Sequence, residues 1–245
     1  MKQLDPQALY EPLKADRLRY CCALLALQQG GNEAFASDGE NCYALVHQYP
    51  YGTFAFFTDY DPVFFKQVLR RYPTLDLCID LPPGKTPSVE RMRGLKPYPE
   101  PWEFFAYEGE VPAAPVDPHI RLLAKLEEEE RALLGPFAVN PLELGKPGMV
   151  AFAWFEGESP AACLLCSPEV EDIWDVSGTY RLPQHSKASF DAKLLYAYLQ
   201  YVRKLGCIPQ ISDTRDLEPA AAPSAGFVPC SIRYAFKYQK PVIFS

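Results

Sequence analysis

The chain has 245 residues, of which 48% are hydrophobic, and a formal net charge of −7. Domains typically run to about 100–200 residues, so we expect two domains with modest cores. Lys and Arg are scattered along the sequence and form no basic stripe. The electrostatic attraction that dominates nucleic-acid binding is therefore missing, and we expect neither nucleic acid nor an anionic membrane as a partner.

The N-terminal segment and the cysteines indicate a cytoplasmic protein. The first residues lack the apolar core of a signal peptide, and no apolar run approaches the roughly 18 residues of a membrane span. The cysteines lie mostly among apolar neighbours, as reduced and buried thiols do. Cys163 and Cys166 sit three apart in a strand-like run, so they should point to opposite faces of a sheet. No histidine has a partner at zinc-site spacing, and we expect no metal.

Periodicity and breaker residues predict alternating helices and strands in the first half. In chain order we expect a helix at 7–29 with Pro12 as the place for a break, strands at 42–48 and 52–58 forming a hairpin, a helix from Pro62 capped by Asp61, a strand at 75–81, a short helix at 88–95 and a strand at 102–110.

Prolines are frequent between residues 97 and 118, which predicts an extended connection and a domain boundary near residue 112. A strand, crossover helix and strand in the second half favour a parallel pair within an α/β fold. The expected elements are a helix from Asp117-Pro118 to about Leu134, strands at 148–158, 160–167 and 171–182, a helix to about Leu205, a strand at 208–213, a short alanine-rich helix, and strands around Phe227 and at 231–238.

The two halves repeat the same spacing between landmarks. The interval from Leu75 to Gly94 equals that from Cys207 to Gly226. The next interval, from either glycine to an aromatic strand, is also the same in both halves, and it leads to Trp102 in one and to Tyr234 in the other. This pattern favours an internal structural repeat.

The second half resembles the GNAT superfamily of acyl-coenzyme-A-dependent N-acyltransferases over about residues 117–238. The order of the expected elements matches, as do Pro183 at the end of the fourth strand, Leu194-Leu195 in the helix after it, the strand at 208–213 and the pair Gly226-Phe227. The resemblance implies an α/β (α+β) fold with a mixed, mostly antiparallel sheet flanked by helices. It implies two tandem copies, a divergent N-terminal domain at 1–112 and a C-terminal domain at 113–245.

In that family the loop after the fourth strand follows Arg/Gln-x-x-Gly-x-Gly/Ala, and its amides hold the pyrophosphate of coenzyme A at a helix start. The resemblance places acetyl-CoA or CoA against the following residues: Tyr180, Arg181, Leu182, Ser186, Lys187, Ala188, Ser189, Phe190 and Asp191. None of the family's glycines is present, so the loop motif is degenerate. The carboxylate of Asp191 would repel a phosphate, whereas Lys187 would attract one. In the alternative interpretation, Ser189 or Asp191 caps the helix in place of a ligand.

The catalytic residues that the resemblance suggests are equally divergent. The family uses an acidic residue of the fourth strand as a base, and Glu171 and Asp175 are the candidates here, with Asp172 beside them. Glu171 and Asp175 would share a sheet face, which the alternative interpretation treats as a solvated polar face. The position of the family's tyrosine acid holds Ala222, which donates no proton. The neighbouring landmark positions hold Arg215 and Glu218.

Two functions therefore stay open. The first is transfer of an acyl group from acetyl-CoA or another acyl-CoA to an amine of a small molecule or peptide. The second is a GNAT-fold protein without catalysis that binds a ligand or a partner, because a fold does not establish chemistry. Both require that the fourth and fifth strands separate into a V beside the helix start. The tryptophans Trp102, Trp154 and Trp174 are candidates either for the walls of a binding cleft or for ordinary core residues.

Overall fold

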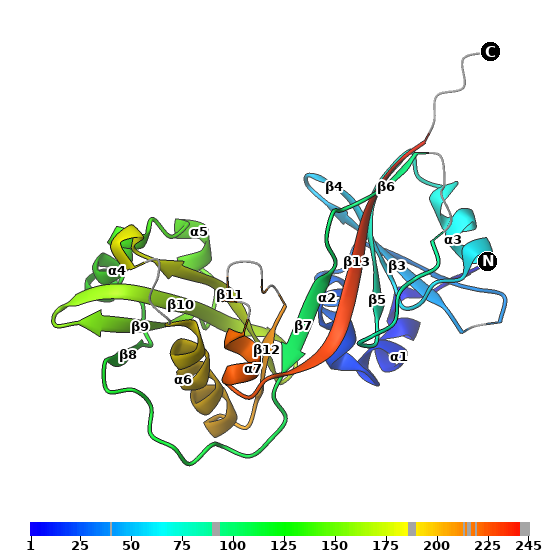
Figure 1. Ribbon diagram of the computed structural model, residues 1–245. Helices are drawn as coiled ribbons and strands as arrows, with labels where there is room; N and C mark the ends of the chain where they lie inside the picture. The colour runs from blue at the N-terminus through cyan, green and yellow to red at the C-terminus, as the bar shows by residue number, and fades with distance from the viewer. Residues whose placement is uncertain are drawn as a thin grey trace. The chain divides into compact units, whose positions relative to one another are not determined.

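The protein divides by its contacts into two compact units, shown in Figure 1. The structure is a computed structural model that describes residues 1–39, 41–89, 94–185, 190–212, 214, 217–218 and 220–240. Unit 1 comprises Met1–Glu103 together with the chain from Cys230 onward, and unit 2 comprises Phe104–Pro229.

Unit 1 is a sheet in the order β1-β2-β3-β4-β5-β13. Its pairs are antiparallel, except that β4 and β5 run parallel. A short strand, β6, pairs with β13. The elements are β1 (Lys2–Leu4), a 3-10 turn at Pro6–Leu9, α1 (Tyr10–Lys14), α2 (Arg17–Gln29), β2 (Asn32–Ala36), β3 (Tyr43–Tyr49), β4 (Gly52–Phe57), α3 (Pro62–Leu69), β5 (Thr74–Leu81), β6 (Leu95–Pro97) and β13 (Val228–Gln239).

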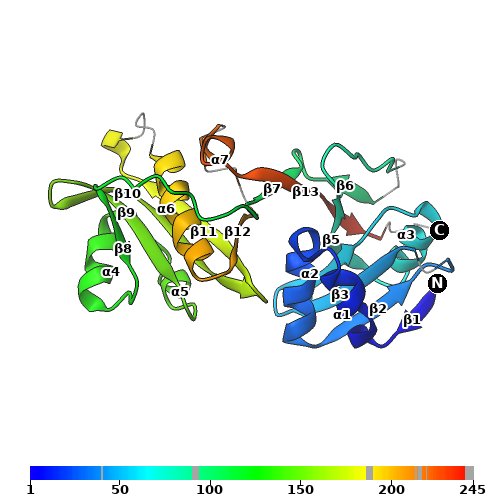
Figure 2. The same cartoon turned by 90° about the horizontal axis from the view of Figure 1, so that it is seen from below.

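Unit 2 is a sheet in the order β8-β9-β10-β11-β12-β7, and again only one pair, β11 with β12, is parallel. Figure 2 shows α6 and α7 on one face of this sheet and α4 and α5 on the other. The elements are β7 (Trp102–Ala106), β8 (Ile120–Leu123), α4 (Glu128–Leu134), a 3-10 turn at Gly135–Phe137, α5 (Pro141–Leu144), β9 (Val150–Glu156), β10 (Ser159–Val170), β11 (Ile173–Arg181), a 3-10 turn at Pro183–His185, α6 (Asp191–Lys204), β12 (Ile208–Ile211) and α7 (Ala221–Ser224).

The two sheets have the same order of strand directions, and the internal repeat predicted from spacing is confirmed. In each sheet three antiparallel pairs are followed by one parallel pair and a final antiparallel pair. The spacing landmarks also agree in backbone conformation, because Gly94 has φ +89° and Gly226 has φ +95°. Side chains rarely adopt these left-handed angles, which explains a glycine at both positions.

The sixth strand of each sheet comes from the other half of the chain. β13, which follows the unit 2 elements, pairs with β5 of unit 1 from Ile232↔Leu81 to Gln239↔Thr74. β7, which follows the unit 1 elements, pairs with β12 of unit 2 through Phe105 and Ala106. The contact-based division therefore falls between residues 103 and 104 and again between 229 and 230. A domain boundary near 112 stays a prediction about the two tandem copies.

The proline-rich segment around residue 112 lies along α6. Gln200 donates from Nε2 to the Pro112 carbonyl at 2.9 Å, and the Tyr196 hydroxyl donates to the Ala114 carbonyl at 3.0 Å. Lys193 Nζ lies 2.8 Å from Asp117 Oδ2 and, with the His119 amide, holds the pKa of Asp117 well below its usual range. Polar side chains of one helix thus fix a segment that cannot join a sheet because of its prolines.

Two of the predictions are wrong, one about a helix in the second half and one about the break in the N-terminal helix. The expected helix from Asp117 is instead strand β8, followed by a turn in which Leu126 has φ +48° and then by α4 from Glu128. Glu130 accepts hydrogen bonds from the amides of Lys125 and Leu126 at 3.0 and 2.7 Å. Its carboxylate therefore stabilises this turn. The N-terminal helix is interrupted at Asp16 rather than at Pro12. The short helix expected at 88–95 falls partly on residues 90–93, outside the described residues, and β6 begins at Leu95.

A substitution of Phe236 tests whether β13 belongs to the core of unit 1. Its ring is buried with side chains of α3, β4 and β5, so Phe236→Ala should cost about 3–5 kcal/mol of unfolding free energy. Hydrogen exchange should report faster exchange of β5 amides while β10 amides keep their protection. The matched control is Lys237→Ala, an exposed neighbour on the same strand. Loss of protection in β10 with β5 unchanged would contradict the assignment.

Candidate functional site

The parallel strands β11 and β12 separate after three paired residues. The pairs are Ile173↔Ile208, Trp174↔Pro209 and Asp175↔Gln210, and β11 then continues to Arg181 beside β10 alone. Within this stretch Val176 and Gly178 pair with adjacent residues of β10, which leaves Ser177 as the extra residue of a β-bulge. A bulge bends the strand that carries it, and this one lies directly after the last residue of β11 that pairs with β12.

Asp175 spans the two strands where their backbone pairing ends. Its Oδ1 accepts the amides of Val176 and Ser212, both at 2.9 Å, and its Oδ2 accepts the Ser212 hydroxyl. The side chain is half-buried. The carboxylate therefore has a structural role at the point of separation, and its acceptor capacity is largely used.

Tyr198 fills the junction of the two strands from the side of α6. Its hydroxyl lies 2.6 Å from the Trp174 carbonyl and 3.0 Å from the Gln210 carbonyl, and it accepts the Gln210 amide at 3.1 Å. Tyr198 is fully buried, and burial raises its pKa well above the usual value. The periodicity of the sequence places Tyr198 on the apolar face of its helix and does not indicate these polar contacts.

The first residue of α6 places a buried carboxylate at the helix start. Asp191 is 0% exposed. It accepts Arg181 Nε at 3.1 Å on Oδ1, and a second guanidinium hydrogen bond as well as the Glu218 amide, at 2.7 Å, on Oδ2. The N-cap residue Phe190 makes no side-chain capping bond. The described hydrogen bonds of Asp191 go to β11 and to the segment before α7, and Ser189, the other capping candidate, lies outside the described residues.

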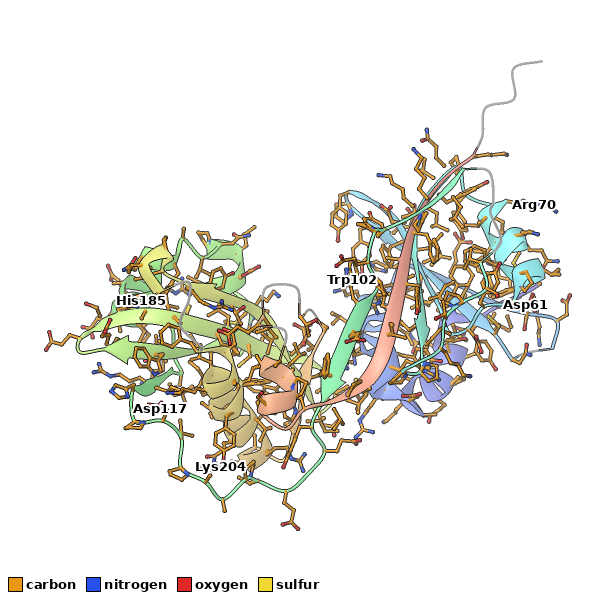
Figure 3. All side chains as sticks on the ribbon, viewed as in Figure 1. Asp61, Arg70, Trp102, Asp117, His185 and Lys204 are labelled. Carbon is orange, nitrogen blue, oxygen red and sulfur yellow. The ribbon has the colours of Figure 1, made fainter. Side chains whose placement is uncertain are left out.

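The described part of this helix start is unfavourable for a bound pyrophosphate. Phosphate binding at a helix start relies on free donors and a positive local charge. Here the aspartate is an anion in that place, and it uses the guanidinium of Arg181 and the amide of Glu218. The predicted contacts Ser186, Lys187, Ala188 and Ser189 lie outside the described residues, which stop at His185, labelled in Figure 3, and resume at Phe190.

The corresponding helix start in unit 1 is also occupied by an aspartate. Asp61, labelled in Figure 3, precedes α3 and accepts the amides of Val63 and Phe64 at 2.9 and 3.0 Å. Pro62 has no amide hydrogen to offer. Unlike the parallel pair of unit 2, the strands β4 and β5 remain paired up to Phe57, the last residue of β4. Unit 1 therefore has neither the separated strands nor the donors of a phosphate site among its described residues.

Comparison with known proteins gives a clear result for the fold. No family model and no curated protein matches the sequence. Among solved structures, a GCN5-related N-acetyltransferase from Sphaerobacter thermophilus superposes with a TM-score of 0.60 at 11% identity, over 100% of this chain and 96% of the other. One from Kribbella flavida gives 0.57 at 13% identity, over 88% and 94%.

The chain has the GNAT fold. A tandem GNAT protein of the clavulanic acid biosynthesis pathway superposes with a TM-score of 0.50 at 11% identity, over 99% of this chain and 98% of the other. This likeness agrees with the two equivalent sheets, so both the predicted fold class and its tandem arrangement are confirmed.

The remaining predicted residues do not gather at the start of α6. Glu171 has φ +55° and lies in the turn before β11. The prediction that it shares a strand face with Asp175 is therefore wrong. Tyr180 points to the opposite face from Arg181, where its hydroxyl donates to Glu143 Oε2 at 2.9 Å and Leu182 packs nearby. Of the described candidates, Arg181, Phe190 and Asp191 lie on the side of the sheet that α6 covers.

Other sequence-based expectations for unit 2 can be compared directly with the structure. Cys163 and Cys166 belong to the cores on opposite faces, as predicted. Ala222 is buried in α7 and donates no proton. Trp154 and Trp174 pack against the core under α6, which favours their interpretation as core residues. No cluster able to hold a metal occurs among the described residues, and no helix among them could cross a membrane.

Asp191 should contribute more to stability than Asp117, an aspartate of the same unit whose side chain is 17% exposed. Asp191→Ala leaves Arg181, whose side chain is only 21% exposed, without its partner, and should lower the unfolding free energy by about 2–4 kcal/mol. Asp117→Ala, which removes a pair with the exposed Lys193, should cost about 1 kcal/mol or less. Urea denaturation of both variants measures the difference, and equal losses would contradict a structural role for Asp191.

Proposed function

We propose that this chain is a GNAT-fold binding protein that does not use coenzyme A at α6. The observation that carries the proposal is the buried carboxylate of Asp191 beside Arg181 and the Glu218 amide. The carboxylate of Asp191 competes with a phosphate for the same positive charge and hydrogen-bond donors. A phosphate that displaced it would have to break the buried ion pair between Asp191 and Arg181, which costs free energy. The absence of a tyrosine at Ala222 supports the same conclusion.

A pocket in unit 1 supports a small molecule as the ligand. Its volume is about 590 Å³, within the range of about 300–1,000 Å³ usual for ligand sites. The walls are mostly proline, aliphatic and aromatic side chains: Pro87, Val89, Leu95, Pro97, Tyr98, Pro99, Pro101, Tyr234, Ala235 and Phe236, together with Glu100. The Tyr234 hydroxyl is already bonded to the Lys85 carbonyl and the Thr86 hydroxyl, which leaves apolar contact as the main attraction.

Acyl transfer from acetyl-CoA or another acyl-CoA to a small-molecule or peptide amine is the second candidate. The separation of β11 from β12 favours it, since both strands end beside α6 as an acyl-carrier site requires. Asp175 and Glu171 would be the candidate bases, and Lys187 the candidate phosphate contact. In this function Asp191 would have to release Arg181 before the cofactor binds.

Calorimetric titration with acetyl-CoA and with free CoA separates the two candidates. We expect no binding at millimolar ligand, because Asp191 occupies the helix start. Asp191→Gly removes the internal anion and should bind coenzyme A more tightly than the unmodified protein, once circular dichroism has shown that it folds. Micromolar binding by the unmodified protein that is lost in Lys187→Glu would contradict the proposal and favour acyl transfer.

An apolar probe tests the pocket itself. N-phenylnaphthylamine is uncharged and fluoresces in apolar sites, so it should bind and its affinity should fall about tenfold in Tyr98→Ser, which removes one aromatic wall. The matched control is Tyr51→Ser, which changes a tyrosine of the same unit that is 86% exposed and outside the pocket. Equal binding by both variants would contradict the pocket as the ligand site.

A further inference from the structure

Two neighbouring cysteines of α2 form a thiol pair in unit 1. Cys21 and Cys22 have sulfur atoms 3.8 Å apart. Cys21 is buried, whereas Cys22 is half-buried. The residue before them, Tyr20, has the non-helical angles φ −106° and ψ 20°, so a new helical segment starts at the cysteines. Helix starts favour negative charge, including that of a thiolate.

A buried ion pair lies beside the thiol pair. Arg233 of β13 bonds Asp80 of β5 through two contacts, Nε to Oδ1 at 2.7 Å and Nη2 to Oδ2 at 2.9 Å. Their side chains are 7% and 1% exposed. A guanidinium has five N–H donors, of which Asp80 takes two. The charge of Arg233 also lowers the pKa of Cys22, so one cation acts on a carboxylate and a thiol together.

The groups around Cys22 favour its ionised form. The hydrogen bond from Cys21 and the charge of Arg233 lower its pKa, against the opposing effects of burial and Asp80, to about 6. From β5, the Cys78 thiol is fully buried, and burial holds its pKa well above the usual value, so it stays neutral. From β3, burial raises the pKa of Tyr49, which also stays neutral. Cys22 is therefore the thiol of this cluster whose surroundings lower its pKa, and it is half-buried where Cys78 is fully buried.

We propose that Cys22 is a site of reversible thiolation by low-molecular-weight disulfides. The Cys22 thiolate attacks one sulfur of a disulfide R–S–S–R, a bond forms between Cys22 Sγ and that sulfur, and the S–S bond breaks. The leaving group departs as the thiolate R–S⁻ with the electron pair, so charge and electrons balance without another oxidant. A free thiol reverses the step by the same exchange.

The reaction should stop at the mixed disulfide. Cα atoms of neighbouring residues on a trans peptide lie about 3.8 Å apart, shorter than the roughly 4.4–6.8 Å usual for disulfides. Closing a bond between Cys21 and Cys22 would thus require the backbone to leave its helical geometry. Cys21 instead acts as a hydrogen-bond donor that stabilises the attacking thiolate.

Dithiodipyridine, a neutral aromatic disulfide, tests the proposal on the whole chain. We expect rapid release of one equivalent of thiopyridone, with the label mapped to the Cys22 peptide by mass spectrometry. The rate should rise with a midpoint near pH 6. At about pH 6.5 it should exceed that of an ordinary free cysteine about fivefold, since the larger thiolate fraction outweighs the lower nucleophilicity of an acidic thiol.

Two variants sharpen the result. Cys22→Ser should lose the fast phase, whereas Cys207→Ser, which removes another half-buried thiol, should keep it. If Cys22→Ser does not fold, peptide mapping and the pH profile of the unmodified protein decide alone. A midpoint above pH 8, or labelling of other cysteines with Cys22 left free, would overturn the proposal. Release of two equivalents with a Cys21–Cys22 disulfide would overturn the claim that the reaction stops at the mixed disulfide.

Discussion

The contacts of one carboxylate, that of Asp191, join the start of α6 to the second sheet of this protein. A helix start beside separated parallel strands is the usual place for a phosphate, because unpaired amides and the helix dipole attract negative charge. Here the chain supplies the negative charge itself, buries it, and pairs it with Arg181 and the Glu218 amide. The arrangement links β11, α6 and the segment before α7, so the carboxylate on which the proposed function rests also joins three parts of the unit.

In unit 1 the start of the equivalent helix is also occupied by an aspartate, but through other contacts. Asp61 takes the first amides of α3, and the strands in front of that helix do not separate. The two units therefore keep the order and direction of the GNAT strands while differing in how the helix start is satisfied. Conservation of a fold through its hydrophobic pattern, with independent change at its polar site, is expected because packing and chemistry depend on different residues.

The sequence predicted the framework well and the polar contacts poorly, for physical reasons. Apolar periodicity and the matched glycines Gly94 and Gly226 are local signals, and they located most elements and the repeat. The partner of Asp191 is not local, since Arg181 reaches it only once β11 and α6 are packed together. Glu171 was misplaced on a strand because composition does not reveal a left-handed turn residue, and β8 was mistaken for a helix because a short amphipathic run fits either period.

The exchange of the sixth strands has a consequence for how the protein is made. Ribosomal synthesis proceeds from the N-terminus, and domains usually fold in that order as they emerge. The β5 edge of the first sheet must wait for β13, which is made only after the other elements of unit 2, whereas β7 is made before the rest of the second sheet. A nascent chain therefore has an unpaired β5 edge until β13 has been made, and an unpaired strand edge is a template for pairing with another chain.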